Sequence, residues 1–264
     1  EGYLLGGEDI KFVVDQEYQW DNPLTVQYAD APAMGQIEIV KTDSETGDPL
    51  EEAEFTITAT EDIVTPDGTV HAAAGDIVDT VVSGEDGTAK SKKLYLGKYT
   101  VTETKQPTGY VLPDQSWEVE LTYKDQYTEL VTETLEVEND ATVVIIDKKV
   151  TGSEQRLSGV KFAIWNKDTE DPVDPGMTYK DIYKTDREGK IRLERFVPGT
   201  YCIKEVEGVP GYAVNDTIHE FTVTEDGRID GQAETTITIE NAKTEIVETN
   251  ALNIETGDQN AYPK

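Results

Sequence analysis

The chain repeats itself at a fixed spacing, and this repeat constrains its fold more than any other feature. Motifs in the two halves recur 102 residues apart, as in the pairs Glu103 and Glu205, Tyr110 and Tyr212, and Asn139 and Asn241. Upstream, Lys41 and Lys148 lie 107 residues apart, so the first copy carries about five additional residues between Phe55 and Gly87. In a chain of 264 residues, this duplication predicts two domains of about 100 residues each.

A partial third copy precedes the other two. The segment Gly2-Tyr3-Leu4-Leu5 resembles Gly109-Tyr110-Val111-Leu112, and Asp30 lies near the position that corresponds to Asn139. Glu1 does not resemble a natural start, so we expect the chain to be a fragment of a longer protein. The predicted organisation is therefore the C-terminal strands of a preceding partial repeat (1–34), a first domain (35–140), a second domain (141–243) and a flexible acidic tail (244–264).

Short alternating apolar and polar runs predict that both copies consist of antiparallel strands. Ile37 and Ile39 lie on one face of a run, and Ile237 and Ile239 do so in the second copy. Turn sequences such as Glu85-Asp86-Gly87 separate the runs, and no capped amphipathic helix is recognisable. The pattern predicts an all-β chain of tandem immunoglobulin-like β-sandwiches with six to eight strands each. The short junction between the copies predicts a stiff rod.

Composition excludes several classes of function. The net charge of −31 argues against binding to nucleic acid or to an anionic membrane surface, because both require clustered Lys and Arg. One cysteine and two histidines leave no disulfide framework and no Cys-based zinc site. No apolar run approaches the ~18 residues of a membrane span. We therefore expect no cofactor, no metal and no membrane span in this fragment.

Each copy places three polar residues at the ends of apolar strand faces. These are Lys41, Glu103 and Asn139 in the first copy and Lys148, Glu205 and Asn241 in the second. Strand alternation predicts that all six side chains point into the sandwich cores, where an isolated charge costs several kcal/mol. Burial lowers the pKa of a lysine and raises that of a glutamate, giving a neutral amine beside a protonated acid. Such an amine could attack the Asn carboxamide, with Glu103 or Glu205 as the proton shuttle, and leave a Lys–Asn amide cross-link.

These motifs resemble the collagen-adhesin B-type (CnaB, or SpaA-type) domains of Gram-positive surface proteins and pilins. The resemblance rests on runs such as Ile37–Asp43, Tyr99–Glu103 and Val137–Asn139 and their counterparts in the second copy, and it covers residues 35–243. It implies a CnaB-type sandwich in which the first-strand Lys and the last-strand Asn form an isopeptide bond assisted by the Glu. In the second copy Lys149 adjoins Lys148. The spacing to Leu157 and strand alternation both favour Lys148, but they do not decide between the two.

The resemblance implies an extracellular, cell-wall-anchored stalk or pilin segment, with sortase, the cell wall and other pilin subunits as partners. On this interpretation the chain is not an enzyme, because the cross-linking is a single-turnover reaction. One alternative is an adhesin module that binds a host or matrix ligand, and a second is an accessory segment of a secreted enzyme. The tail (244–264) is a candidate wall-anchor region, since Thr256-Gly257 and Tyr262-Pro263-Lys264 loosely resemble sorting and pilin motifs.

The remaining polar residues have simpler interpretations. Acidic turns containing Asp86, Asp174 or Asp226 match no EF-hand spacing, so we interpret them as solvated turns rather than Ca²⁺ sites. Cys202 is expected on the sheet face opposite the core, as a thiol without a role. His71, expected on a loop, and His219, expected on a strand, have no nucleophile as a partner.

Overall fold

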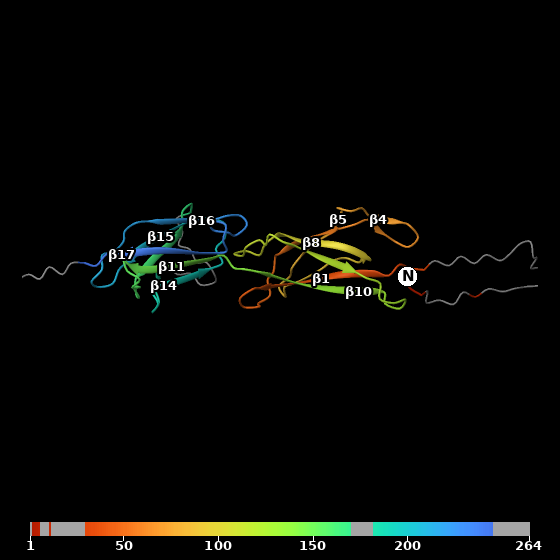
Figure 1. The fold of residues 1–264 in the computed structure, drawn as a ribbon, viewed down its shortest axis with the longest axis horizontal. Coiled ribbons are helices and arrows are strands. Elements are labelled where there is room, and N and C mark those ends of the chain that lie inside the picture. Colours follow the sequence, from red (N-terminus) through yellow and green to blue (C-terminus); the bar gives the residue numbers. More distant parts are fainter. Residues whose placement is uncertain (1, 6–10, 12–29, 170–181, 245–264) are drawn as a thin grey trace, which may run out of the picture.

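The computed structural model describes residues 2–5, 11, 30–169 and 182–244. All the secondary-structure elements in these ranges are strands, so the described residues contain no helix that could cross a membrane. Two β-sandwiches lie end to end and give the molecule an elongated shape (Figure 1). The predicted all-β, tandem-sandwich fold is therefore confirmed.

The first sandwich is built from β1 to β10. One sheet has the order β10-β1-β6, with β7 also pairing to β1, and the facing sheet has the order β5-β2-β8-β9. The strands are β1 (Met34–Asp43), β2 (Glu54–Ala59), β3 (Ile63–Val64), β4 (Val70–Ala72), β5 (Ile77–Val82), β6 (Thr88–Lys90), β7 (Leu94–Tyr95), β8 (Gly97–Lys105), β9 (Ser116–Leu121) and β10 (Leu130–Asn139).

The second sandwich repeats this plan with β11 to β17. Its sheets have the orders β14-β11-β17 and β13-β12-β15-β16. The strands are β11 (Val143–Val150), β12 (Lys161–Asn166), β13 (Tyr183–Lys184), β14 (Lys190–Glu194), β15 (Gly199–Glu207), β16 (His219–Val223) and β17 (Glu234–Asn241).

The first sandwich exceeds the predicted six to eight strands because of an inserted hairpin. Strands β3 and β4 pair only with each other, in the region where the first copy carries its additional residues. His71 lies in β4 rather than on a loop, and its ring stacks on Tyr95 with 3.5 Å between centroids. The insertion thus forms a small sheet of its own at one end of the sandwich.

In both sandwiches the first and last strands are adjacent and parallel. β1 pairs with β10 so that Lys41 lies opposite Val137 and Asp43 opposite Asn139. β11 pairs with β17 in the same register, with Lys148 opposite Ile239. A parallel pair within an otherwise antiparallel fold brings the C-terminal ends of both strands to the same end of the sandwich. The residues at those ends are consequently neighbours, although the chain between them is long.

The core of each sandwich lies between its two sheets and follows the strand alternation. Along β1 every second residue is buried, which places Ile37, Ile39 and Lys41 on one inward face. Phe55 and Tyr99 face them from the other sheet, as Phe162 and Tyr201 do in the second sandwich. Burial of these large side chains supplies the main stabilisation of each domain.

The seam between the sandwiches is formed by the loop 107–112 of the first and by two loops of the second. Thr142 links them, because its N–H donates to Gly109 O (3.0 Å) and its hydroxyl donates to Gly227 O (2.7 Å). Gly227 has φ of +79°, and a Cβ there would lie 2.1 Å from Tyr110 O. Only glycine fits this contact, so backbone packs directly on backbone across the seam.

An isolated antiparallel β-bridge formed by a tyrosine occurs three times in the described residues. Tyr110 bridges Ala141, Tyr212 bridges Lys243, and Tyr3 bridges Pro32. The third instance belongs to the segment predicted as the remnant of a preceding repeat. The remainder of that segment, residues 1, 6–10 and 12–29, lies outside the described residues.

Candidate functional site

The two lysines at the ends of β1 and β11 are fully buried. Lys41 and Lys148 both have 0% exposure, although a lysine is almost never buried without a partner. They continue the inward faces that begin with Ile37 on β1 and Val144 on β11. The strand period of two residues therefore places a charged side chain at a core position in each domain.

In the first domain the carboxamide and the carboxyl are hydrogen-bonded to each other. Asn139 at the end of β10 donates from Nδ2 to Glu103 Oε1 on β8 at 2.6 Å. Lys41 Nζ donates to the backbone carbonyls of Val137 (3.2 Å) and Thr42 (3.3 Å). Among the described residues, Glu103 Oε2 and Asn139 Oδ1 are buried without a hydrogen-bond partner. Two buried acceptors and one buried amine thus share this site.

In the second domain the three side chains form a closed triangle. Lys148 Nζ lies 3.1 Å from Glu205 Oε2 and also donates to Asn241 Oδ1. Asn241 Nδ2 donates to Glu205 Oε1 at 2.7 Å. The six residues predicted from the sequence therefore lie together as two clusters of three.

Lys148, and not its neighbour Lys149, belongs to the second cluster. Lys149 points to the opposite face, where it forms ion pairs with Glu154 (2.9 Å) and Asp147 (3.7 Å). The hydrogen bond to Glu154 raises the pKa of Lys149, which keeps it charged. The geometry selects Lys148, which strand spacing and alternation favoured without deciding.

Burial alters the proton affinities of these groups in the direction that favours nucleophilic attack. Burial lowers the pKa of Lys41 to about 8, against the opposing charge of Glu103. Burial raises the pKa of Glu103 to about 7, against the hydrogen bond from Asn139. In the second domain burial lowers the pKa of Lys148, opposed by Glu205. The neutral form of the amine is therefore far more populated at these two lysines than at an exposed lysine.

The surroundings of the two clusters differ because two equivalent positions carry different residues in the two copies. The N–H of Asn215 lies 3.4 Å from Glu205 Oε2, whereas Pro113 occupies the corresponding place in the first copy and has no N–H to donate. His219 pairs with Ile203 as Trp117 pairs with Val101, so it lies on the sheet face that also carries Glu205.

His219 is a residue whose surroundings the sequence interpretation missed. Its Nε2 is buried and has no hydrogen-bond partner among the described residues. Burial, followed by the charge of Lys148, lowers its pKa. The signal available in the sequence was its alignment with Trp117, which is partly buried and packs against the core of the first sandwich.

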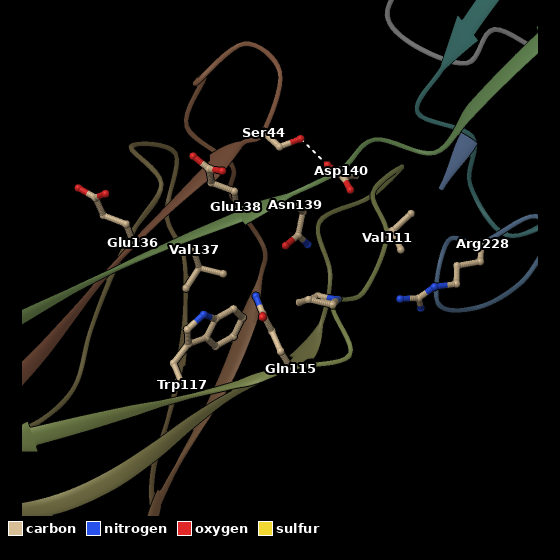
Figure 2. A pocket seen from close by; sticks show the side chains of 11 residues that line it. Ser44, Val111, Gln115, Trp117, Glu136, Val137, Glu138, Asn139, Asp140 and Arg228 are labelled. Carbon is tan, nitrogen blue, oxygen red and sulfur yellow. Dashed lines mark hydrogen bonds between the residues drawn. The ribbon is translucent and has the colours of Figure 1, made fainter. Parts of the chain in front are cut away.

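A cavity of about 460 Å³ adjoins the first cluster (Figure 2). Its walls come from β10, including Asn139, from the segment 111–117 and from Arg228 of the second sandwich. Ser44 donates a hydrogen bond to Asp140 (2.6 Å) at its rim. The first cluster therefore lies next to a solvent-accessible space at the seam between the domains.

The family described as SpaA, prealbumin-like fold domain, matches residues 35–135 and again residues 142–243. The chain belongs to the SpaA family. The first match ends within β10, four residues before Asn139, and the second match covers all of the second sandwich. Lys41 and Glu103 lie in the first matched segment, and Lys148, Glu205 and Asn241 lie in the second.

Several solved structures resemble the tandem SpaA domains at low sequence identity. The Bacillus anthracis TIE protein is 22% identical with a TM-score of 0.41, over 81% of this chain and 35% of that chain. GBS52, the minor pilin of Streptococcus agalactiae, is 18% identical with a TM-score of 0.35, over 82% and 99%. The shaft pilin SpaA of Lactobacillus rhamnosus GG is 15% identical with a TM-score of 0.35, over 81% and 99%. This chain spans about a third of the TIE protein, and no curated protein matches it.

The other candidates in the SpaA domains do not form sites. Cys202 is outside the core cluster but is only 4% exposed, and burial raises the pKa of its thiol. Within the described ranges, no three His, Cys, Asp or Glu side chains are arranged to hold a metal ion. Asp174 lies outside the described residues.

Proposed function

We propose that this chain is a structural stalk segment of a Gram-positive surface protein, stiffened by two self-formed Lys–Asn bonds. The observation that carries the proposal is the complete burial of Lys41 and Lys148, each grouped with one Asn and one Glu. A buried lysine with two carbonyl acceptors and a carboxyl is costly as an ordinary core element. Conversion to an amide removes that cost, because the charged amine disappears.

The reaction balances without any co-reactant. The neutral amine Nζ attacks Cγ of the Asn, forming a C–N bond and a tetrahedral intermediate. The protonated Glu hydrogen-bonds to the carboxamide, and it can accept the amine proton while donating one to the departing nitrogen. The bond from Cγ to Nδ2 then breaks, and ammonia leaves. Holding the groups together in a dry core supplies the effective concentration that lets this occur once, without turnover.

The cavity beside Asn139 supports this assignment in the first domain. It joins the site to solvent, so ammonia released at Asn139 has a route out of the sandwich. In the second domain, the contact of Lys148 with Asn241 Oδ1 and the ion pair with Glu205 already hold the amine against the carboxamide. We therefore propose cross-links from Lys41 to Asn139 and from Lys148 to Asn241.

The proposed setting is extracellular, as part of a wall-anchored stalk or pilus shaft. Membership of the SpaA family and the end-to-end sandwiches support this setting. Its partners would be sortase and the cell wall, or neighbouring pilin subunits. The strongly negative surface keeps such a stalk soluble and away from anionic envelopes.

High-resolution intact mass of the purified chain tests the proposal. We expect a mass lower than that of the sequence by two molecules of ammonia, and cross-linked peptides containing Lys41 with Asn139 and Lys148 with Asn241. Glu103→Gln and Glu205→Gln should each restore one ammonia, whereas Glu154→Gln, which alters only the partner of Lys149, should restore none. An unmodified mass in the folded wild-type chain would overturn the proposal.

A further inference from the structure

The first cross-linking cluster lies directly beside the seam, next to a second buried acid. Asp43 follows Lys41 by two residues on the same face of β1 and lies opposite Asn139 in the strand register. It is 4% exposed. Residues two apart on a strand face are neighbours, so the charge of Asp43 acts on the amine of Lys41.

Asp43 is held in its ionised form by contacts from both domains. Tyr110 donates its hydroxyl to Asp43 Oδ2 at 2.8 Å, and the N–H groups of Glu45 and Thr46 donate to Oδ1. Arg195 of the second domain places Nη2 4.0 Å from Oδ2. Burial would raise the pKa of Asp43, but these hydrogen bonds and the Arg195 charge outweigh it and lower the pKa.

The backbone of Arg195 adopts a conformation that residues other than glycine rarely adopt. It has φ of +64°, and its N–H donates to Thr142 O at 2.8 Å. Its guanidinium lies 5.7 Å from the centre of the Tyr110 ring, within cation–π range. A Cβ on Gly109 would lie 2.7 Å from Arg195 Cβ, so the two loops are in close contact. A strained residue at such a contact indicates that its position matters.

The second cluster lacks this arrangement. Val150 lies opposite Asn241, where the first domain has Asp43 opposite Asn139. Tyr212 corresponds to Tyr110, and its hydroxyl accepts a hydrogen bond from Gln155 instead of donating to an acid. Among the described residues, an acid that lies opposite the cluster Asn and is contacted by an arginine of the other domain is therefore found only at the first cluster.

We infer that Arg195 of the second domain is a positioning residue for the cross-linking reaction of the first domain, acting through Asp43 and Tyr110. This inference rests on the proposed function. The carboxylate of Asp43 favours the charged form of Lys41, which cannot attack. Arg195 offsets that charge and fixes Tyr110 and Asp43 at the end of the strand pair. Docking of the second domain thereby promotes bond formation in the first.

The acidic and basic groups that act on this site come from several elements. Asp43 lies on β1, Glu103 on β8 and Glu138 on β10, with Asp140 just beyond β10. All four carry negative charge when ionised and raise the pKa of Lys41. Arg195 is the cation that acts on Asp43. Removing the Arg195 charge therefore leaves the net charge around Lys41 and Asp43 more negative.

The test measures cross-linking of the full chain as it folds. Chain purified from inclusion bodies under denaturing conditions, with its unreacted mass verified, is diluted into buffers between pH 6 and pH 9 and quenched over time. Peptide mapping then quantifies the Lys41–Asn139 and Lys148–Asn241 products separately. The variants are Arg195→Gly, which keeps the positive φ accessible, and Arg195→Lys, which keeps the charge.

For Arg195→Gly we expect the Lys41–Asn139 bond to form about threefold more slowly at neutral pH, which corresponds to a rise of about half a unit in the pH midpoint. Arg195→Lys should restore most of the rate, and Lys148–Asn241 should form at the wild-type rate in both. Arg192→Ala, which removes an exposed ion pair with Glu45 across the same seam (2.8 Å), should change neither bond.

An unchanged rate and pH midpoint for Lys41–Asn139 in Arg195→Gly would overturn the inference, and so would equal slowing of both bonds. Either result would leave the proposed function intact, because the bonds still form. Absence of both bonds in the wild-type chain would overturn the proposed function itself.

Discussion

At the scale of single residues, the proposed cross-linking depends on burying a lysine and a glutamate together, away from water. Lys41 and Glu103 both tend to their neutral forms because burial penalises the charged ones. This makes the unreacted first domain sensitive to pH in a way that a cross-linked domain would not be. The sensitivity follows from comparing the folded pKa of each group with its unfolded value.

The stability of an unreacted first domain should pass through a minimum near neutral pH. In Asn139→Ala, Glu103 holds its proton more tightly when folded, so the unfolding free energy falls as pH rises from 4.5 towards about 7. Lys41 releases its proton more easily when folded, so the unfolding free energy rises again from about pH 8 to 10.5. Urea unfolding across this range checks the prediction.

The control for this prediction is the double variant Lys41→Met/Asn139→Ala, which lacks the buried amine. In this variant the unfolding free energy should still fall as the pH rises from 4.5 towards about 7. It should no longer rise between about pH 8 and 10.5. A rise of equal size in the double variant would mean that Lys41 does not titrate as described.

At the scale of structural elements, the seam depends on close backbone packing around Gly227. Gly227→Ala would place its Cβ against Tyr110 O, and the loop 107–112 would have to move. Gly231 has nearly the same φ (+77°), but a Cβ there would have no atom within 4 Å, so Gly231→Ala isolates the cost of the backbone angle. That cost alone is about 1 kcal/mol.

We expect Gly227→Ala to loosen the joint between the domains and Gly231→Ala to leave it unchanged. Small-angle X-ray scattering should show a shorter or more variable maximum dimension for Gly227→Ala only. Thermal unfolding should show the larger loss of stability in the same variant. Identical scattering curves for the two variants would show that the contact with Tyr110 does not maintain the joint.

At the scale of the whole molecule, the parallel pairing of first and last strands determines how the rod carries force. Tension enters at the start of β1 and leaves after β10, and the proposed bond joins Lys41 to Asn139 near the ends of both strands. Residues 42–138 then lie outside the force path. The second sandwich repeats this arrangement between Lys148 and Asn241.

Single-molecule stretching should therefore show little extension from either domain of the wild-type chain. Glu103→Gln should release residues 42–138 and add about 320–350 Å of contour length in one step, because an extended residue spans about 3.3–3.6 Å. Glu154→Gln is the matched control and should behave like the wild type. A release of that length in the wild-type chain would contradict a closed first domain.

Much of this was predictable from local pattern. The constant 102-residue spacing established the two domains and their corresponding residues, and strand alternation placed Lys41, Glu103 and Asn139 on inward faces. The repeat spacing and the strand alternation can both be read from the sequence without knowing which strands are neighbours. The insertion of β3 and β4 was detected only as surplus length, since short strands of this kind carry no clear period.

The sequence by itself determined the fold class, the duplication and five of the six cluster residues, and for the sixth it favoured Lys148 over Lys149. Only the tertiary structure decided that Lys148 rather than Lys149 meets Asn241, and that Arg195 reaches Asp43 from the other domain. These contacts join residues that are distant along the chain, and they depend on strand register and on loop conformations such as the positive φ of Arg195. Periodicity assigns a side chain to a face, whereas packing of the sheets and loops determines which side chain it meets there.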